Sequence, residues 1–161
     1  MTHIIDENVF IVAENPLHVS GIDCHDACRD LLESVRLGRQ KIGLDTEGGI
    51  LYGKYQKQIQ KTPLNGISRA FLVWLLTNEW NDNIVQRVEV ADAELPDGFK
   101  TFDADDQIFL LVALNSPSKP SIIHNATDSD WLFFEQTAKK NYLETQQVTI
   151  NQLCRDCLKD I

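Results

Sequence analysis

The chain has 161 residues, of which 43% are hydrophobic and 24% charged, and its formal net charge at pH 7 is −9. This length and composition predict one soluble globular domain, over residues 1–161, with a sizeable core. The acidic balance argues against a broad phosphate-binding surface. No apolar run is long enough to cross a membrane, and the start lacks the layout of a secretory signal. The sequence therefore predicts a cytoplasmic protein with no membrane partner.

The first half of the chain predicts two strands and three helices. Residues 3–6 (HIID) form a short apolar run that ends in an acid, which indicates a buried strand. Residues 23–37 carry apolar side chains at helical spacing, and Gly38 follows as a stop. Residues 41–45 predict a second strand that also ends in an acid. Helices are expected at 49–60 and 65–80.

The second half continues the alternation of strand and helix. Residues 84–90 are β-branched and predict a third strand, and a helix that opens with acids is expected at 103–115. A strand at 121–125, a helix at 128–141 and a strand at 147–150 come next, before a helix at the C-terminus. This order predicts an α/β fold, namely a three-layer α/β/α sandwich with a mostly parallel central sheet.

Acidic residues follow the predicted strands or open the predicted helices. Asp6 ends the first strand, Asp128 and Asp130 follow the strand at 121–125, and an acidic run opens the helix at 103–115. Ligands of open α/β sheets bind beyond the carboxyl ends of the strands. Carboxylates that meet there repel one another unless a cation lies between them, and oxygen ligands favour Mg²⁺ or Mn²⁺. The pattern therefore indicates a metal site.

Each acid also has a purely structural explanation. Asp128 and Asp103 could each be the N-cap of the helix that follows, and Asp105 could be solvated helix charge. Asp6 stands between two apolar runs, where an unpartnered carboxylate would be unfavourable. The sequence leaves capping and cation binding open.

The four cysteines fall into two closely spaced pairs, Cys24 with Cys28 and Cys154 with Cys157. If the two pairs met, they could bind zinc. Small buried thiols of a cytosolic protein explain the same residues more simply.

Three segments together resemble the motifs of PIN-domain nucleases. IIDENVFIVAENP is similar to the family's opening, in which a strand ends in Asp and a polar residue follows two positions on. FDADDQIFLLVAL resembles its third acidic motif, and IIHNATDSDW resembles its closing motif. The resemblance runs in the right order from Asp6 to about Trp131.

The resemblance implies a role for each matching residue. Asp6, Asp106 and Asp128 match catalytic metal ligands of the family. Asn8 matches its supporting polar residue, and Asp103 could assist from one helical turn before Asp106. Asp130 matches a further ligand or a residue that holds one. The chain departs from the pattern at the second acid, because Lys54 stands where a Glu is expected before Tyr55. Glu47 or Asp45 could supply the missing carboxylate.

The activity implied by the resemblance is metal-dependent hydrolysis of phosphodiester bonds, most often in RNA and otherwise in DNA, with Mg²⁺ or Mn²⁺ as cofactor. Seven of the fifteen basic residues lie between positions 36 and 69, and Lys54, Lys57 and Arg69 among them would contact the nucleic-acid backbone. The family also implies a toxin or defence role, with a protein inhibitor or antitoxin as partner, and is compatible with a homo-oligomer. Trp80, Trp131 or Tyr55 could stack on a base or pack in the core.

Two other hypotheses about the function remain open. Lys54 favours a PIN-like domain that binds nucleic acid or a protein without cleaving. A receiver or phosphatase domain also gathers Asp residues at strand ends. A receiver, however, needs a lysine at the end of a late strand. After position 119 no predicted strand ends in a lysine, since Lys139 and Lys140 lie on a predicted helix.

Overall fold

The computed structural model describes residues 1–46 and 49–158. Its centre is a five-stranded sheet in the order β3-β2-β1-β4-β5, and all neighbouring strands are parallel. The strands are β1 (Thr2–Ile5), β2 (Ile42–Asp45), β3 (Val85–Val88), β4 (Ser121–Asn125) and β5 (Val148–Gln152). The chain adds β2 and β3 on one side of β1, then crosses over to add β4 and β5 on the other. The strand order therefore reverses between β1 and β4.

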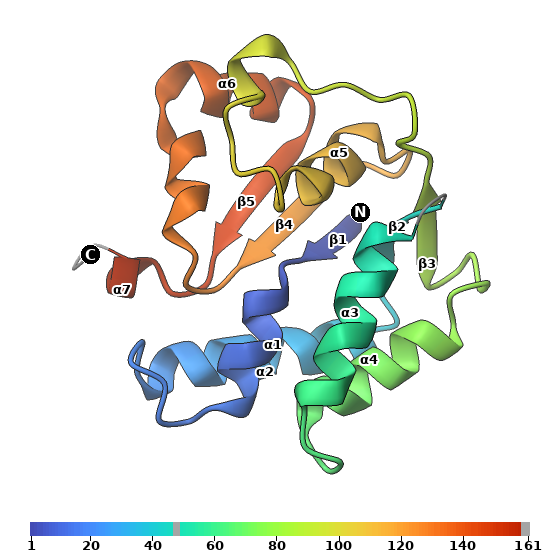
Figure 1. Cartoon of the computed structure of the whole chain (residues 1–161), viewed down its shortest axis with the longest axis vertical. Helices are drawn as coiled ribbons and strands as arrows, with labels where there is room; N and C mark the ends of the chain where they lie inside the picture. The colour runs from blue at the N-terminus through green and yellow to red at the C-terminus, as the bar shows by residue number, and fades with distance from the viewer. Residues whose placement is uncertain (47–48, 159–161) are drawn as a thin grey trace.

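Helices flank this sheet (Figure 1). They are α1 (Glu7–Glu14), α2 (Ile22–Leu37), α3 (Ile50–Lys61), α4 (Ile67–Thr77), α5 (Gln107–Asn115), α6 (Thr137–Thr145) and α7 (Arg155–Leu158), with 3₁₀ turns η1 (Asp97–Phe99) and η2 (Ser129–Glu135). Helix α5 packs on β1, β2 and β4, α6 packs on β5, and α1, α2 and α4 pack on one another. The predicted α/β/α sandwich is confirmed, and the strand order differs from the 2-1-3-4-5 order of receiver domains.

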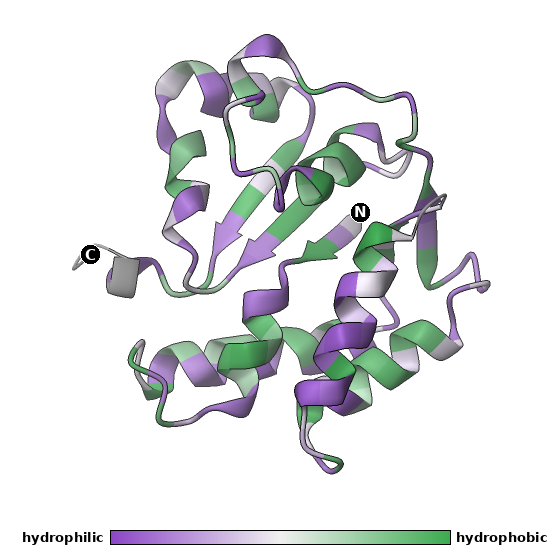
Figure 2. Cartoon of the chain, in the orientation of Figure 1, coloured by the Kyte–Doolittle hydropathy of each residue, from purple (hydrophilic) through white to green (hydrophobic). Residues whose placement is uncertain are grey.

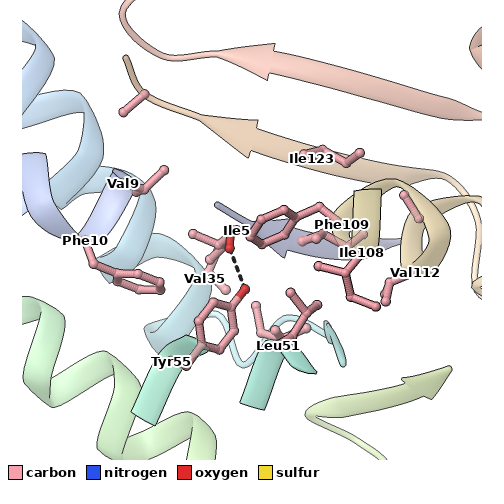
Figure 3. Packing of buried hydrophobic residues seen from close by; sticks show 14 of the residues in the cluster. Ile5, Val9, Phe10, Val35, Leu51, Tyr55, Ile108, Phe109, Val112 and Ile123 are labelled. Carbon is pink, nitrogen blue, oxygen red and sulfur yellow. Dashed lines mark hydrogen bonds between the residues drawn. The ribbon is translucent and has the colours of Figure 1, made fainter. Parts of the chain in front are cut away.

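The core lies where α3 and α5 meet the central strands. All four residues of β1 and of β2 are buried, as parallel strands covered on both faces require. Figure 2 shows α5 as a largely hydrophobic helix. Tyr55 of α3 is fully buried, and its hydroxyl donates a hydrogen bond to the carbonyl of Ile5 (Figure 3). This bond satisfies a polar group inside the core and ties α3 to the end of β1.

Helix α1 is absent from the sequence-based prediction. Its residues include a β-branched, apolar run that suggests a continuation of the strand, yet Val9, Phe10, Val12 and Ala13 are buried at helical spacing. Asp6 accepts a hydrogen bond from the backbone N–H of Asn8 and so caps this helix. A strand end and a helix start therefore share one carboxylate.

Two predicted helix boundaries are wrong. The helix expected at 103–115 begins at Gln107, so Asp103 is not its N-cap; its carboxylate instead accepts from the N–H of Asp105. The helix expected at 128–141 is a 3₁₀ turn, η2, followed by α6. A 3₁₀ turn places residues three apart on one side, which buries both Trp131 and Phe134.

The cysteines pair across the chain and not within their closely spaced groups. Cys24 of α2 and Cys154, just after β5, form a disulfide, which corrects the expectation of free core thiols at these two positions. Cys28 is a buried free thiol, as expected, and burial raises its pKa to about 12. Although the sulfur atoms of Cys24, Cys28 and Cys154 all lie within 4.8 Å of one another, the disulfide leaves only Cys28 of these three as a ligand for zinc. The side chain of Cys157 lies outside the described part of the structure, and among the side chains that are described the zinc site is not supported.

Within the described part of the chain, no helix has both the length and the apolar character needed to cross a membrane.

Candidate metal centre

Three carboxylates from distant parts of the chain meet at the carboxyl edge of the sheet. Asp6 follows β1, Asp128 follows β4, and Asp106 precedes α5; each offers an oxygen, and these oxygens lie within 4.8 Å of one another. Strands β1 and β4 are neighbours, with Ile5 opposite His124. The three acids therefore lie where the strand order reverses, which is the usual position of a ligand site in open α/β sheets.

Asp6 is the most deeply placed of the three, with 2% of its surface exposed. Besides the bond from the Asn8 N–H, its Oδ2 accepts a hydrogen bond of 2.8 Å from the indole Nε1 of Trp131. Burial raises the pKa of Asp6 to about 7, since these hydrogen bonds offset only part of the lost hydration. Trp131 is fully buried, so its role is to hold Asp6 and to fill the core, and not to stack on a base.

Asp106 occupies the N-cap position of α5, but its carboxylate makes no capping hydrogen bond. The side chain is thus not committed to its own helix. Burial, followed by the negative charges of Asp6 and Asp128, raises its pKa to about 8. Like charges held this close favour protonation unless a cation neutralises them.

Asp128 caps the 3₁₀ turn η2 and also belongs to the acidic cluster. Its Oδ1 accepts from the backbone N–H of Asp130 at 2.9 Å, which caps η2, while the residue also belongs to the group of three. The two explanations that the sequence left open for Asp128 are therefore compatible. Asp130 is exposed and lies outside the group, although the charge of Asp128 raises its pKa. Asp103 is exposed as well.

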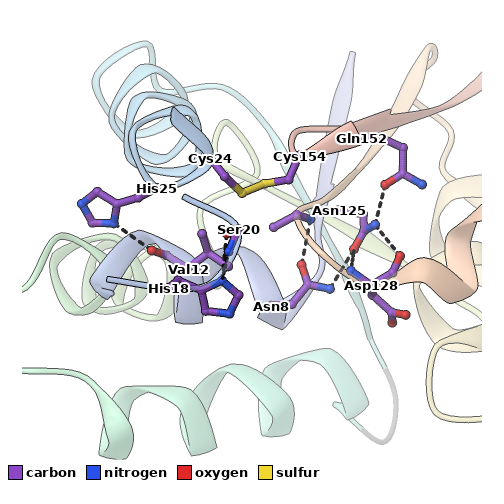
Figure 4. The surroundings of a disulfide bond; sticks show 11 residues. Asn8, Val12, His18, Ser20, Cys24, His25, Asn125, Asp128, Gln152 and Cys154 are labelled. Carbon is purple, nitrogen blue, oxygen red and sulfur yellow. Dashed lines mark hydrogen bonds between the residues drawn. A yellow bond between two sulfur atoms is a disulfide. The ribbon is translucent and has the colours of Figure 1, made fainter. Parts of the chain in front are cut away.

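Side-chain amides connect the two strand ends that carry Asp6 and Asp128. Asn8 donates to Asn125 Oδ1 at 2.7 Å and accepts from the N–H of Ala126 at 2.8 Å. Asn125 in turn donates to the carbonyl of Asp128 at 2.8 Å and to Gln152 of β5 (Figure 4). Asn8 thus lies where a supporting residue was predicted, while the roles of Asn125 and Gln152 carried no sequence signal beyond their polarity near strand ends.

Lys54 lies beside the cluster, paired with an acid that the sequence analysis overlooked. Its Nζ is 2.9 Å from Oε1 of Glu7, and the two side chains are 20% and 25% exposed. Burial lowers the pKa of Lys54, but Glu7, Asp106 and Asp105 outweigh it and raise the pKa above its usual value. Glu7 directly follows Asp6, so recognition of α1 from sequence would have placed it in the first turn beside the site.

The remaining predicted site residues lie elsewhere or have other partners. Glu47 falls outside the described residues. Asp45 caps α3, because its two oxygens accept from the N–H groups of Ile50 and Leu51 at 2.7 and 2.8 Å. Both of its oxygens are thus engaged by α3, and Asp45 does not belong to the group of three acids.

The predicted substrate-contacting side chains have separate surroundings. Arg69 donates to the carbonyl of Ile59 at the end of α3, and Lys57 is exposed on that helix. Trp80 is 75% exposed, with the guanidinium of Arg87 4.7 Å from its ring centre.

The donor set suits a hard divalent cation. All donors are oxygens, as Mg²⁺ and Mn²⁺ prefer, and burial followed by the charges of neighbouring acids raises the pKa values of Asp6 and Asp106. Among the described residues, Oε2 of Glu7 is also a buried oxygen without a hydrogen-bond partner. Asp6, Asp106 and Asp128 would hold such an ion.

Comparison of the chain with protein-family models, with curated proteins and with solved structures gives no match. The fold and the geometry of the acidic cluster are therefore the basis for any functional conclusion.

Proposed function

We propose that the chain is a metal-dependent endonuclease that hydrolyses phosphodiester bonds, with RNA as the first substrate to test. The observation that carries the proposal is the meeting of Asp6, Asp106 and Asp128 where the strand order reverses. The resemblance of their three motifs to those of PIN-domain nucleases gives additional support.

The side chains around the cluster have distinct tasks in this proposal. Bound Mg²⁺ or Mn²⁺ supplies a water of lowered pKa and offsets the charge that develops on phosphorus. Trp131 fixes one oxygen of Asp6 through its indole N–H, and Asn8 holds the ends of β1 and β4 at a constant separation. Such supporting bonds orient the ligands and raise their affinity for the ion.

Cleavage of a single-stranded RNA in Mn²⁺ tests the proposal. Wild type should cleave, and Asp6→Asn and Asp128→Asn should each lose at least about 100-fold in rate, because each removes a charged ligand. Asp105→Asn is the matched control, since Asp105 is exposed and does not belong to the group of three. The proposal fails if wild type cleaves no faster than the Asp6 and Asp128 variants.

Binding without cleavage is the second candidate function, and the observation that favours it is the Lys54–Glu7 ion pair beside the cluster. In that case wild type would bind the RNA in Mn²⁺ and leave it intact.

A further inference from the structure

Lys54 is the cation that the chain itself brings to the acidic cluster. It extends from α3 to Glu7, the neighbour of Asp6, and its Nζ lies 5.5 Å from the ring centre of Phe109, one turn into α5 from Asp106. Its contacts with α1 and α5, above all the ion pair with Glu7, hold the ammonium at the edge of the site.

We propose that Lys54 takes the place of a second metal ion, so that the centre binds a single divalent cation and Lys54 contacts the substrate phosphate. This inference rests on the proposed function and specifies how many ions the site takes. Two-metal sites of phosphoryl chemistry place two ions about 3.5–4 Å apart, one on each side of the phosphate. In this chain an ammonium stands on one side of the cluster.

Charge balance favours this arrangement. Asp6, Glu7, Asp106 and Asp128 carry four negative charges when ionised. One divalent ion together with Lys54 brings three positive charges, which leaves the site slightly negative. A second divalent ion would bring the positive charge to five and would be repelled by Lys54. A lysine is also a common phosphate-binding group, acting as a point charge with three donors.

Glu7 sets the position of Lys54. One of its oxygens accepts a hydrogen bond from Nζ at 2.9 Å, and both side chains are largely shielded from solvent. Because Glu7 begins α1 directly after Asp6, the same backbone turn places the first metal ligand and the partner of Lys54.

The test is the number of Mn²⁺ ions bound per chain, measured by calorimetry and by electron paramagnetic resonance without substrate. Wild type should bind one ion with the spectrum of an isolated Mn²⁺. Lys54→Glu should bind two ions with the coupled spectrum of a close pair, because the substitution replaces a cation with a carboxylate. Lys57→Glu, an exposed position on the same helix, should still bind one.

Lys54→Met gives a second readout that does not depend on creating a new site. It should bind one Mn²⁺ about tenfold more tightly, because a nearby positive charge is removed. In Ca²⁺ its affinity for a single-stranded RNA oligonucleotide should fall, with the salt dependence reduced by about 0.7 in slope, as for the loss of one phosphate contact.

Two ions bound by wild type, or one ion bound by a folded Lys54→Glu variant, overturns the inference and leaves the metal centre standing. Unchanged Mn²⁺ and RNA affinities in Lys54→Met overturn it as well. A wild-type chain that binds no Mn²⁺ overturns the proposed function and this inference together.

Discussion

Asp106 is expected to destabilise the folded chain, so Asp106→Asn should make the protein more stable while removing a metal ligand. The carboxylate makes no capping hydrogen bond, and it faces Asp6 and Asp128 within 4.8 Å. Asparagine has nearly the same shape and carries no charge. The substitution therefore removes the cost of burying a charge, together with its repulsion from Asp6 and Asp128, and keeps the size of the side chain.

The magnitude follows from the raised pKa. Asp106 is ionised in the unfolded chain above its ordinary pKa of 3.8 but keeps its proton in the folded chain up to about pH 8. Holding that proton costs about 1.36 kcal/mol per pH unit, which sets a ceiling of about 4 kcal/mol at pH 7. The carboxylates share their protons and are partly screened by water, so we expect a gain of about 1–2 kcal/mol, or roughly 2–8 °C in Tm.

The pH dependence gives the sign. The pKa of Asp106 is higher in the folded chain than in the unfolded chain, so its carboxyl group does not affect stability below pH 3.8. Above that pH the folded chain becomes less stable as the pH rises, and the loss levels off above about pH 8. Urea unfolding followed by tryptophan fluorescence should therefore show a larger advantage of Asp106→Asn at pH 8 than at pH 5. Mn²⁺ at pH 8 should stabilise wild type and not the variant.

Asp105→Asn is the control, because Asp105 is next to Asp106 but exposed. It should change neither the free energy of unfolding nor the stabilisation by Mn²⁺. The reasoning is refuted if Asp106→Asn is less stable than wild type at pH 8, or if its advantage is the same at pH 5.

Three further predictions concern the surroundings of the site. The disulfide joins residues 130 positions apart, so Cys154→Ala should lower the free energy of unfolding by about 2–4 kcal/mol. Dithiothreitol should lower the Tm of wild type but not of this variant. The prediction is wrong if a non-reducing digest of wild type contains no peptide in which Cys24 is linked to Cys154. Burial and the nearby His3 lower the pKa of His124 to about 3, so stability should fall as the pH drops below about 6.5, and the ring should stay neutral at pH 5 by NMR. Trp131→Phe should weaken Mn²⁺ binding about tenfold by removing the N–H that holds Asp6, a loss that calorimetry would detect.

The pKa values of the buried acids are raised and those of the buried histidines are lowered, and together these shifts set the pH at which the fold is most stable. Raised carboxyl pKa values weaken the fold as the pH rises, whereas the lowered pKa values of His3 and His124 weaken it as the pH falls. Without metal, stability should therefore be greatest at mildly acidic pH. A bound divalent cation removes the first effect and should move the maximum to higher pH.

The strands and the acids that follow them were predictable from sequence. Strands buried on both faces need short continuous apolar runs, and such runs stand out at residues 3–6, 41–45 and 121–125. Because parallel strands end at one edge, Asp6 and Asp128 could be placed near each other without coordinates. The α/β/α sandwich follows from the same local signals.

Tertiary packing decided which side chains the site contains and which are already engaged. Asp106 is available because α5 begins at Gln107 and the carboxylate of Asp106 makes no capping hydrogen bond to that helix. Lys54 meets Glu7 only because α3 packs across the start of α1, a contact between residues 47 positions apart. Local patterns report burial and helix or strand preference, but contacts between distant elements depend on how whole helices pack. The same reason explains why Cys24 pairs with Cys154 and not with its neighbour in sequence.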